Sequence, residues 1–276
     1  MNFRKSIFSA STIIGALLFV SCGSNETKET AKEPKLKEEN VTYTGDSTTM
    51  NGFVVYDENA AGARPAVIVV PEWWGLNSYA KMRATELAKL GYIAMAIDVY
   101  GNGKTADNPD SAGAFATPFY QNPQKTKARI EAAIDKLKTY AQTDATNIAG
   151  IGYCFGGGML LNVARLGTPL KGIVSFHGSL VGTPANKELL TSKILVCHGG
   201  ADPFVPETEV ATFKKQMDSI GAAFTFKEYE GATHAFTNPD ATAMGEKFKL
   251  PIKYNAAADT ASWNDMKSFF ATLFNK

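Results

Sequence analysis

A glycine-rich stretch near the middle of the chain constrains the fold most. Residues 148–153 read Ile-Ala-Gly-Ile-Gly-Tyr, which is typical of a buried strand, and residues 154–158 read Cys-Phe-Gly-Gly-Gly. The residues two positions before and after Cys154 are glycines, whose lack of a side chain lets backbone segments approach closely. Cys154 can therefore adopt a strained backbone conformation at the apex of a sharp turn. The helix that follows presents the positive end of its dipole to the thiol, which favours a thiolate. The stretch therefore predicts a strand, a sharp turn with an exposed cysteine, and a helix.

Two alternative roles for this stretch are open at this point. Glycine-rich turns between a strand and a helix also bind phosphate groups. A buried cysteine is more often an unreactive part of the core than a nucleophile. A nucleophilic thiol needs other catalytic side chains beside it. Whether Cys154 is a nucleophile, a core residue or part of a phosphate-binding turn therefore depends on which residues the rest of the chain supplies.

The composition is that of a globular protein with one core. The chain has 276 residues, of which 45% are hydrophobic, and its formal net charge is +1 at pH 7. A chain of this length can bury one sizeable core. The near-neutral charge and the lack of a basic stripe argue against a nucleic-acid partner.

The N-terminal residues differ from the rest and predict a targeting segment. Two basic residues precede an apolar run at residues 7–20, which is too short for a comfortable membrane span. The run ends in Phe-Val-Ser directly before Cys22, a sequence that resembles the lipobox of bacterial lipoproteins. We therefore predict that residues 1–21 are a lipoprotein signal peptide and that Cys22 is the site of lipid attachment. The alternative is a plain secretory signal with an incidental cysteine.

The segment after Cys22 predicts a tether. Residues 22–40 are rich in Glu, Lys and Thr and have almost no large apolar side chain. Such a segment cannot build a core, so we expect it to be disordered and the folded domain to span residues 41–276. The expected location is the bacterial cell envelope, on its periplasmic or outer-membrane face, with membrane contact only through the lipid anchor.

From Val41 onward, strand and helix patterns alternate, which predicts an α/β fold with a mostly parallel central sheet and helices on both faces. The expected strands lie at residues 41–43, 52–56, 66–70, 93–97, 148–153, 172–176, 194–197 and 224–229. The expected helices lie at residues 78–90, 129–141 and 257–274, with one more after Pro206. Residues 101–123 and 238–253 fit neither pattern and are expected to be long loops, either surface insertions or walls of a binding site.

A thiol nucleophile needs a base to take its proton and a carboxylate to orient that base. The chain has three histidines. Of these, His234 lies in a loop after the last strand, and Asp202 lies between it and Cys154 at the end of a strand, which is the order nucleophile, acid, histidine. His177 and His198 are expected to be packing residues near the mouth of the site. His234 could instead be a loop histidine bonded to backbone, and Asp202 a turn residue or helix cap.

Acyl transfer also needs N–H donors for the oxyanion that develops. The backbone N–H of Phe155 is one candidate, because Phe155 follows Cys154. The other comes from the loop after residues 66–70, where Pro71 has no N–H and Trp73 is the better candidate. Cys197 lies in a buried-strand pattern and is expected to be a packing residue, although a disulfide with Cys154 remains possible.

Four spaced motifs together resemble the dienelactone hydrolase (carboxymethylenebutenolidase) family, which has the α/β-hydrolase fold. They are Pro-Glu-Trp-Trp-Gly-Leu-Asn at residues 71–77, Gly-x-Cys-x-Gly-Gly at 152–157, His-Gly-x-x-Asp at 198–202 and Gly-x-x-His-Ala-Phe at 231–236. The resemblance implies that Cys154, His234 and Asp202 form a triad. It also implies that Glu72 lies beside the resting thiol and accepts its proton when substrate binds. Without the resemblance, Glu72 could be an exposed loop carboxylate.

One departure from the family concerns substrate binding. The dienelactone enzymes hold the substrate carboxylate with two arginines, and neither stands in the corresponding places here, where only Lys104 offers a positive charge. Dienelactone itself is therefore not the expected substrate. The triad and the resemblance together predict a hydrolase that cleaves a small ester or lactone through a thioester, with no cofactor and no metal site. Two alternatives stay open: a carbohydrate-ester or peptide hydrolase with the same triad, and a catalytically idle lipoprotein that binds a ligand.

Overall fold

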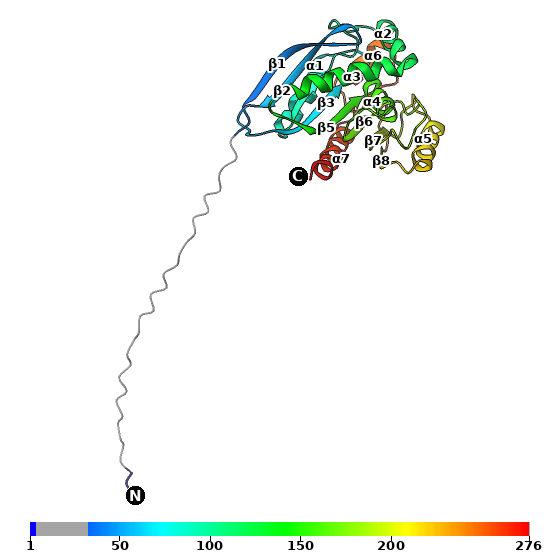
Figure 1. The fold of residues 1–276 in the computed structure, drawn as a ribbon. Helices are drawn as coiled ribbons and strands as arrows, with labels where there is room; N and C mark the ends of the chain where they lie inside the picture. Colours follow the sequence, from blue (N-terminus) through cyan, green and yellow to red (C-terminus); the bar gives the residue numbers. More distant parts are fainter. Residues whose placement is uncertain (4–32, 276) are drawn as a thin grey trace. The chain divides into compact units, whose positions relative to one another are not determined.

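The structure is a computed structural model that describes residues 1–3 and 33–275, and its described strands form one sheet in the order β1-β2-β4-β3-β5-β6-β7-β8 (Figure 1). These strands are β1 (Leu36–Gly45), β2 (Thr48–Asp57), β3 (Arg64–Val70), β4 (Ile93–Ala96), β5 (Thr143–Tyr153), β6 (Gly172–Phe176), β7 (Lys193–Gly199) and β8 (Phe224–Tyr229). β2 pairs antiparallel with β1 and with β4, and the other pairs are parallel. The predicted α/β fold with a mostly parallel sheet is confirmed.

Helices cover both faces of the sheet. Buried side chains of α1 (Ser78–Lys89) and α7 (Ala256–Phe274) pack on one face, and those of α3 (Pro123–Lys138), α4 (Phe155–Arg165) and α5 (Glu207–Ser219) pack on the other. Asparagine side chains cap α1, α3 and α7 by accepting a backbone N–H of the first turn. Such caps satisfy donors that have no partner inside a helix, so local sequence fixes where these helices begin.

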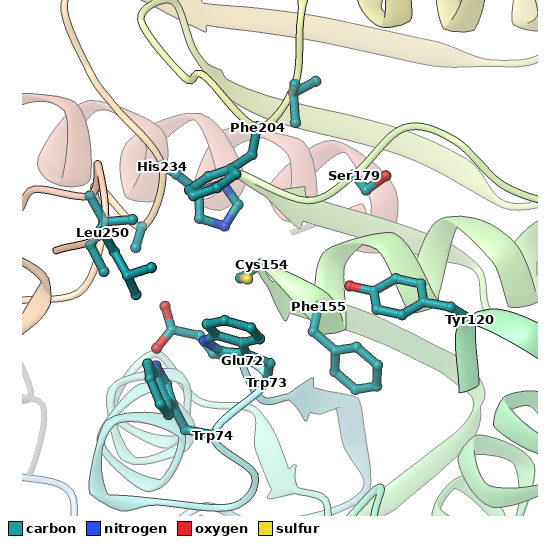
Figure 2. Close-up of a pocket in the computed structure, with 13 residues that line it drawn as sticks. Glu72, Trp73, Trp74, Tyr120, Cys154, Phe155, Ser179, Phe204, His234 and Leu250 are labelled. Carbon is teal, nitrogen blue, oxygen red and sulfur yellow. The ribbon is translucent and has the colours of Figure 1, made fainter. Parts of the chain in front are cut away.

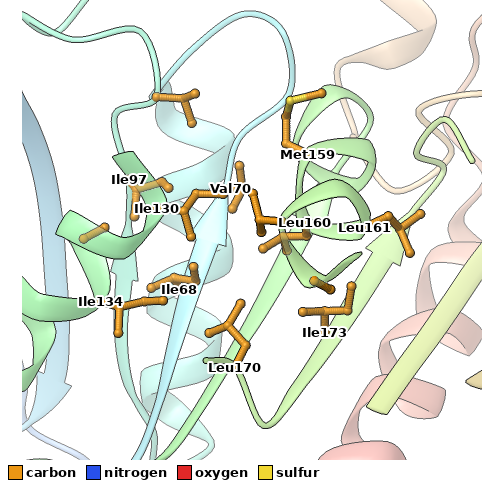
Figure 3. Packing of buried hydrophobic residues seen from close by; sticks show 14 of the residues in the cluster. Ile68, Val70, Ile97, Ile130, Ile134, Met159, Leu160, Leu161, Leu170 and Ile173 are labelled. Atoms are coloured by element: carbon orange, nitrogen blue, oxygen red, sulfur yellow. The ribbon is translucent and has the colours of Figure 1, made fainter. Parts of the chain in front are cut away.

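β3 shows why the central strands are continuous apolar runs. Ile68 and Val70 belong to the core beneath α3 and α4 (Figure 3), whereas Val67 and Val69 belong to the core beneath α1. All four side chains are fully buried. A strand covered on both faces has no solvent-facing position, so the alternation of polar and apolar residues is lost.

The folded domain begins earlier than the predicted boundary at Val41. β1 starts at Leu36 and pairs with β2 along its whole length, from Leu36 opposite Asp57 to Gly45 opposite Thr48. Residues 36–40 therefore belong to the sheet and not to a tether. Their charges suggested a disordered segment, but β1 is an edge strand, where charged side chains discourage pairing with other chains.

Both segments that were expected to be loops contain a helix. α2 (Pro109–Gln121) lies in the first and α6 (Ala241–Phe248) in the second. α2 begins with Pro109 after the capping side chain of Asn108, and Pro118 lies inside it. Its proline, glycine and alanine content gave no clear helical periodicity, which is why the sequence pattern missed it.

Residues 4–32, which hold Cys22 and most of the predicted signal peptide and tether, lie outside the described residues. Among the helices of the described part, none combines the length and the apolar character that a bilayer span requires.

Candidate active site

The predicted sharp turn places Cys154 between the end of β5 and the start of α4. Its backbone has φ 52° and ψ −116°, a conformation that L-amino acids rarely adopt. Glycines make the turn possible: a Cβ on Gly152 would overlap the carbonyl of Gly156, and a Cβ on Gly156 would overlap the carbonyl of Val70. The Cys154 side chain consequently leaves the sheet and borders a pocket.

His234 and Asp202 lie together beside this turn. Nδ1 of His234 is 2.8 Å from Oδ2 of Asp202, whose side chain is fully buried. The other carboxylate oxygen accepts the backbone N–H of Phe204 at 2.9 Å. With Nδ1 turned to Asp202, the His234 ring faces the pocket in which Cys154 lies (Figure 2). α5 has no side-chain cap, so Asp202 is not the helix cap that its position also allowed.

The surroundings of His234 favour its protonated form. Burial by itself lowers the pKa of His234, but the negative charge that Cys154 can carry and the hydrogen bond to Asp202 outweigh burial and raise this pKa to about 10. An imidazolium is therefore stabilised between a thiol that can ionise and a carboxylate. This is the arrangement that a proton transfer between Cys154 and His234 requires.

Glu72 lies in the pocket wall across from the His234 ring (Figure 2). It is 3% exposed, so it is not an exposed loop carboxylate. Burial raises the pKa of Glu72 to about 7, although a 2.7 Å hydrogen bond donated by Asn238 to Oε2 opposes this shift. A carboxyl group with such a pKa can give or take a proton near neutral pH. The sequence did not point to Asn238, because its Asn-Pro pair signals only a turn.

Trp73 and Phe155, the two predicted oxyanion donors, border the same pocket. Phe155 is the first residue of α4, a position whose N–H has no partner inside the helix. The carbonyl of Trp73 accepts a 2.8 Å hydrogen bond from the hydroxyl of Tyr100, which also packs on the Phe155 ring with 5.7 Å between centroids. One tyrosine thus holds both residues in place.

The pocket has a volume of about 200 Å³ and is mainly aromatic and aliphatic. Tyr120 of α2 and Leu250 and Ile252 after α6 line it, so both long segments supply walls (Figure 2). The other lining residues are Glu72, Trp73, Trp74, Cys154, Phe155, Ser179, Phe204, Val205, His234 and Ala235. The lining, as far as the structure describes the chain, includes no lysine or arginine. Lys104 lies instead over the ring of Phe115, 5.8 Å from its centroid.

The other two histidines and the second cysteine have different surroundings. His177 is 1% exposed and accepts the backbone N–H of Cys154 through Nδ1 at 3.1 Å. His198 packs on Phe226, 5.6 Å between centroids, and does not border the pocket. Cys197 is buried, accepts a hydrogen bond from a tyrosine hydroxyl, and is free, as is Cys154, so the two form no disulfide. No group of three or more metal-ligating side chains gathers anywhere in the described residues.

Residues 50–274 match the Dienelactone hydrolase family. The chain belongs to this family. The match spans most of the chain, including the loop that carries Glu72, the turn at Cys154, and the segments that carry Asp202 and His234. The predicted family, and with it the predicted class of hydrolase, is confirmed.

Curated relatives and solved structures agree with this assignment. The chain is 32% identical to "Protein usf" of Aquifex pyrophilus over 75% of its own length and 87% of that protein. It is 31% identical to "Probable 2-oxo-3-(5-oxofuran-2-ylidene)propanoate lactonase" of Bradyrhizobium sp, over 74% of this chain and 82% of that one. A crystal structure of a dienelactone hydrolase-like promiscuous phosphotriesterase from metagenomic libraries superposes with a TM-score of 0.81 at 33% identity, covering 86% of this chain and 98% of that one.

Proposed function

We propose that this protein hydrolyses a small, uncharged ester or lactone through a thioester on Cys154. The observation that carries the proposal is the 2.8 Å bond between His234 and Asp202, which orients the His234 ring toward the pocket that Cys154 borders. A buried thiol packed in a core would have no such partner. The arrangement supplies a nucleophile, a base and an orienting carboxylate in one place.

In the first half of the reaction, His234 takes the proton of Cys154 and Sγ attacks the carbonyl carbon of the substrate. The N–H groups of Trp73 and Phe155 stabilise the oxyanion of the tetrahedral intermediate. The intermediate collapses, the bond to the leaving oxygen breaks, and His234 returns its proton to that oxygen. In the second half, His234 activates a water molecule that attacks the thioester, which releases the acid and restores the thiol.

Glu72 has a proposed role in the resting enzyme. Its carboxyl group has a pKa near 7 and borders the same pocket as Cys154, so it can take up the thiol proton when substrate enters and pass it on to His234, while the thiol stays protonated until then. A thiol kept protonated is less prone to oxidation.

The lining of the pocket supports an uncharged substrate. A substrate carboxylate would meet the carboxyl group of Glu72 and apolar side chains. The imidazolium of His234 is already paired with Asp202, and no lysine or arginine of the described residues lines the pocket to pair with the substrate. Burying an unpaired carboxylate is costly. The lactone named for the Bradyrhizobium relative carries a carboxylate, so we expect a different substrate here.

Hydrolysis of two matched esters tests this function. p-Nitrophenyl butyrate and the p-nitrophenyl monoester of succinic acid have similar length, but only the second carries a charge. We expect the butyrate to be cleaved at least about tenfold faster in kcat/KM, since an unpaired buried charge costs more than the about 1.4 kcal/mol that corresponds to a factor of ten. Cys154→Ala removes the nucleophile and should abolish both activities without changing the thermal unfolding temperature. Equal turnover by Cys154→Ala would exclude Cys154 as the nucleophile. No turnover of either ester would contradict the proposal and favour an idle ligand-binding protein.

A second candidate function is the hydrolysis of uncharged phosphotriesters. It is favoured by the 33% identity to the promiscuous phosphotriesterase and by a pocket lining that, in the described residues, includes no lysine or arginine. In this reaction Sγ attacks phosphorus and displaces the leaving alkoxide or phenoxide, which takes the proton held by His234. Water then attacks phosphorus, which breaks the S–P bond, releases the phosphodiester and restores the thiol. Release of p-nitrophenol from paraoxon, lost in Cys154→Ala, would support it. The absence of such release, with ester hydrolysis intact, would restrict the protein to carboxylic esters.

We also propose that Cys22 carries a lipid that anchors the domain in the cell envelope. The support is the sequence alone: a short apolar run that ends in small residues before Cys22. Metabolic labelling with a fatty-acid analogue should mark the full-length protein and not Cys22→Ala. Recovery of both forms in the soluble fraction would indicate a plain secretory signal.

A further inference from the structure

Two neighbouring strands end in residues with strained backbones. Cys154 follows β5 and His177 follows β6, and these strands pair in parallel with Tyr153 opposite Phe176. Cys154 has φ 52° and His177 has φ 41°, although neither residue is glycine. Such conformations persist only where the surrounding contacts hold them.

A hydrogen bond joins the two strained residues. The backbone N–H of Cys154 donates to Nδ1 of His177 at 3.1 Å and also to the carbonyl of Phe176 at 2.9 Å. Because a backbone N–H can only donate, Nδ1 of His177 must carry a lone pair, and the neutral ring holds its proton on Nε2. Burial lowers the pKa of His177 well below its usual value, in agreement with a neutral ring.

The other side of the His177 ring reaches the loop of His234. Nε2 of His177 lies 2.7 Å from Oγ1 of Thr237 and donates to it. Thr237 is held on two further sides, by a 2.7 Å hydrogen bond with the hydroxyl of Tyr79 and by a 2.7 Å hydrogen bond from Arg83 to its carbonyl. The His177 ring also packs edge-on against the His234 ring, with 5.3 Å between centroids. His177 therefore contacts both the Cys154 turn and the His234 loop.

We propose that His177 is a positioning residue for the reaction: it fixes the Cys154 turn relative to the His234 loop, so that thiol and imidazole meet in the geometry that proton transfer requires. The inference rests on the proposed role of Cys154 as nucleophile. His177 does not border the pocket, so it acts on the rate of thioester formation and not on substrate binding. A displacement of about 1 Å between reacting groups costs about 100-fold in rate.

Two substitutions at His177 separate the hydrogen bond from the backbone strain. Asparagine and glycine both tolerate a positive φ, but only asparagine offers an acceptor near the position of Nδ1. The burst of p-nitrophenol from p-nitrophenyl acetate reports thioester formation at each substrate concentration. We expect His177→Gly to lower the burst rate at saturating substrate about 10- to 100-fold. The substrate concentration that gives half of this rate should change less than about threefold. His177→Asn should keep more than about one third of the rate.

Two further variants complete the test. Thr237→Val removes the hydroxyl that His177 contacts but keeps the shape, and it should slow the burst without adding to the loss in His177→Gly, because the groups act as one unit. His198→Asn changes a buried histidine of the adjacent strand that has no bond to the turn, and its burst should match the parent.

Several results would overturn the positioning role. A burst as fast in His177→Gly as in the parent would show that the hydrogen bond has no effect. Equal slowing in both would assign the effect to ring packing alone. If Cys154→Ala is inactive while every His177 and Thr237 variant matches the parent, only this inference fails. If Cys154→Ala stays active, the proposed function fails first.

Discussion

The side-chain amide of Asn238 donates a 2.7 Å hydrogen bond to Oε2 of Glu72. Glu72 lies in the loop after β3, and Asn238 lies shortly after His234, so one bond joins two loops that border the pocket. It also stabilises the ionised form of a carboxyl group whose pKa burial has raised to about 7. The proton affinity of Glu72 therefore depends on a residue from a distant part of the chain.

Removal of this bond should raise the pKa of Glu72 further. Asn238→Leu keeps the approximate size of the side chain and deletes the donor that favours the carboxylate. The carboxyl carbon of Glu72, followed by NMR in protein labelled at glutamate, should titrate above pH 7 in the variant. Asn186→Leu, a change in a loop outside the pocket, is the matched control. A lower or unchanged titration midpoint in Asn238→Leu would show that the amide does not tune Glu72.

Glu72 should also make stability depend on pH. Its pKa is about 7 in the folded protein against an ordinary value of 4.5, so between these values the folded state binds more protons than the unfolded chain. Its contribution to stability is present below about pH 4.5 and is lost as the pH rises to 7. Glu72→Gln cannot ionise, so relative to the parent it should gain up to about 3 kcal/mol between pH 4.5 and pH 8. Urea unfolding at the two pH values measures this gain, and a difference that is constant with pH would contradict it.

Loss of the Asp202 charge should slow the thiol chemistry. In Asp202→Asn, the imidazolium of His234 loses a stabilising partner, so the pKa of His234 falls and a thiolate at Cys154 is less favoured. We expect the burst rate to drop about 100- to 10,000-fold. Asp218→Asn, at the exposed end of α5, serves as the control, and an equal effect of the two changes would exclude a specific role of Asp202.

Alanine substitutions at Gly156 and Gly113 distinguish the effect of close packing on stability from the effect of helix propensity. A Cβ on Gly156 would overlap backbone carbonyls of residues 70 and 71, whereas a Cβ on Gly113, inside α2, has no atom within 4 Å. Gly156→Ala should therefore destabilise the fold by about 1–3 kcal/mol or more. Gly113→Ala should stabilise it by up to about 1 kcal/mol. Urea denaturation measures both, and a Gly156→Ala variant as stable as the parent would show that the turn relaxes easily.

Local sequence was sufficient for most of the architecture. Some signals act through neighbours along the chain, so they can be recognised from the sequence alone. These are the apolar runs of β3 and β5 and the asparagine caps of α1 and α7. At the Cys154 turn, Gly152 is required by a local contact with Gly156, whereas Gly156 is required by the carbonyls of residues 70 and 71, which only the assembled sheet brings close. The sequence pattern did not predict α2, because its proline and glycine residues weaken the local helix signal. It did not predict the start of β1 either, because the charged residues there are typical of a disordered segment. In both places tertiary packing outweighs the local preference.

The sequence by itself determined the fold class, the family, and the residue types that could form a reactive site: Cys154, His234, Asp202 and Glu72. Only the tertiary structure decided how these residues are held. The bond from Asn238 to Glu72, the support of Trp73 and Phe155 by Tyr100, and the link from Cys154 through His177 to Thr237 all join segments far apart in the chain. Burial at these contacts sets the pKa values and the distances, and burial arises only when the sheet has assembled, so no local pattern records it.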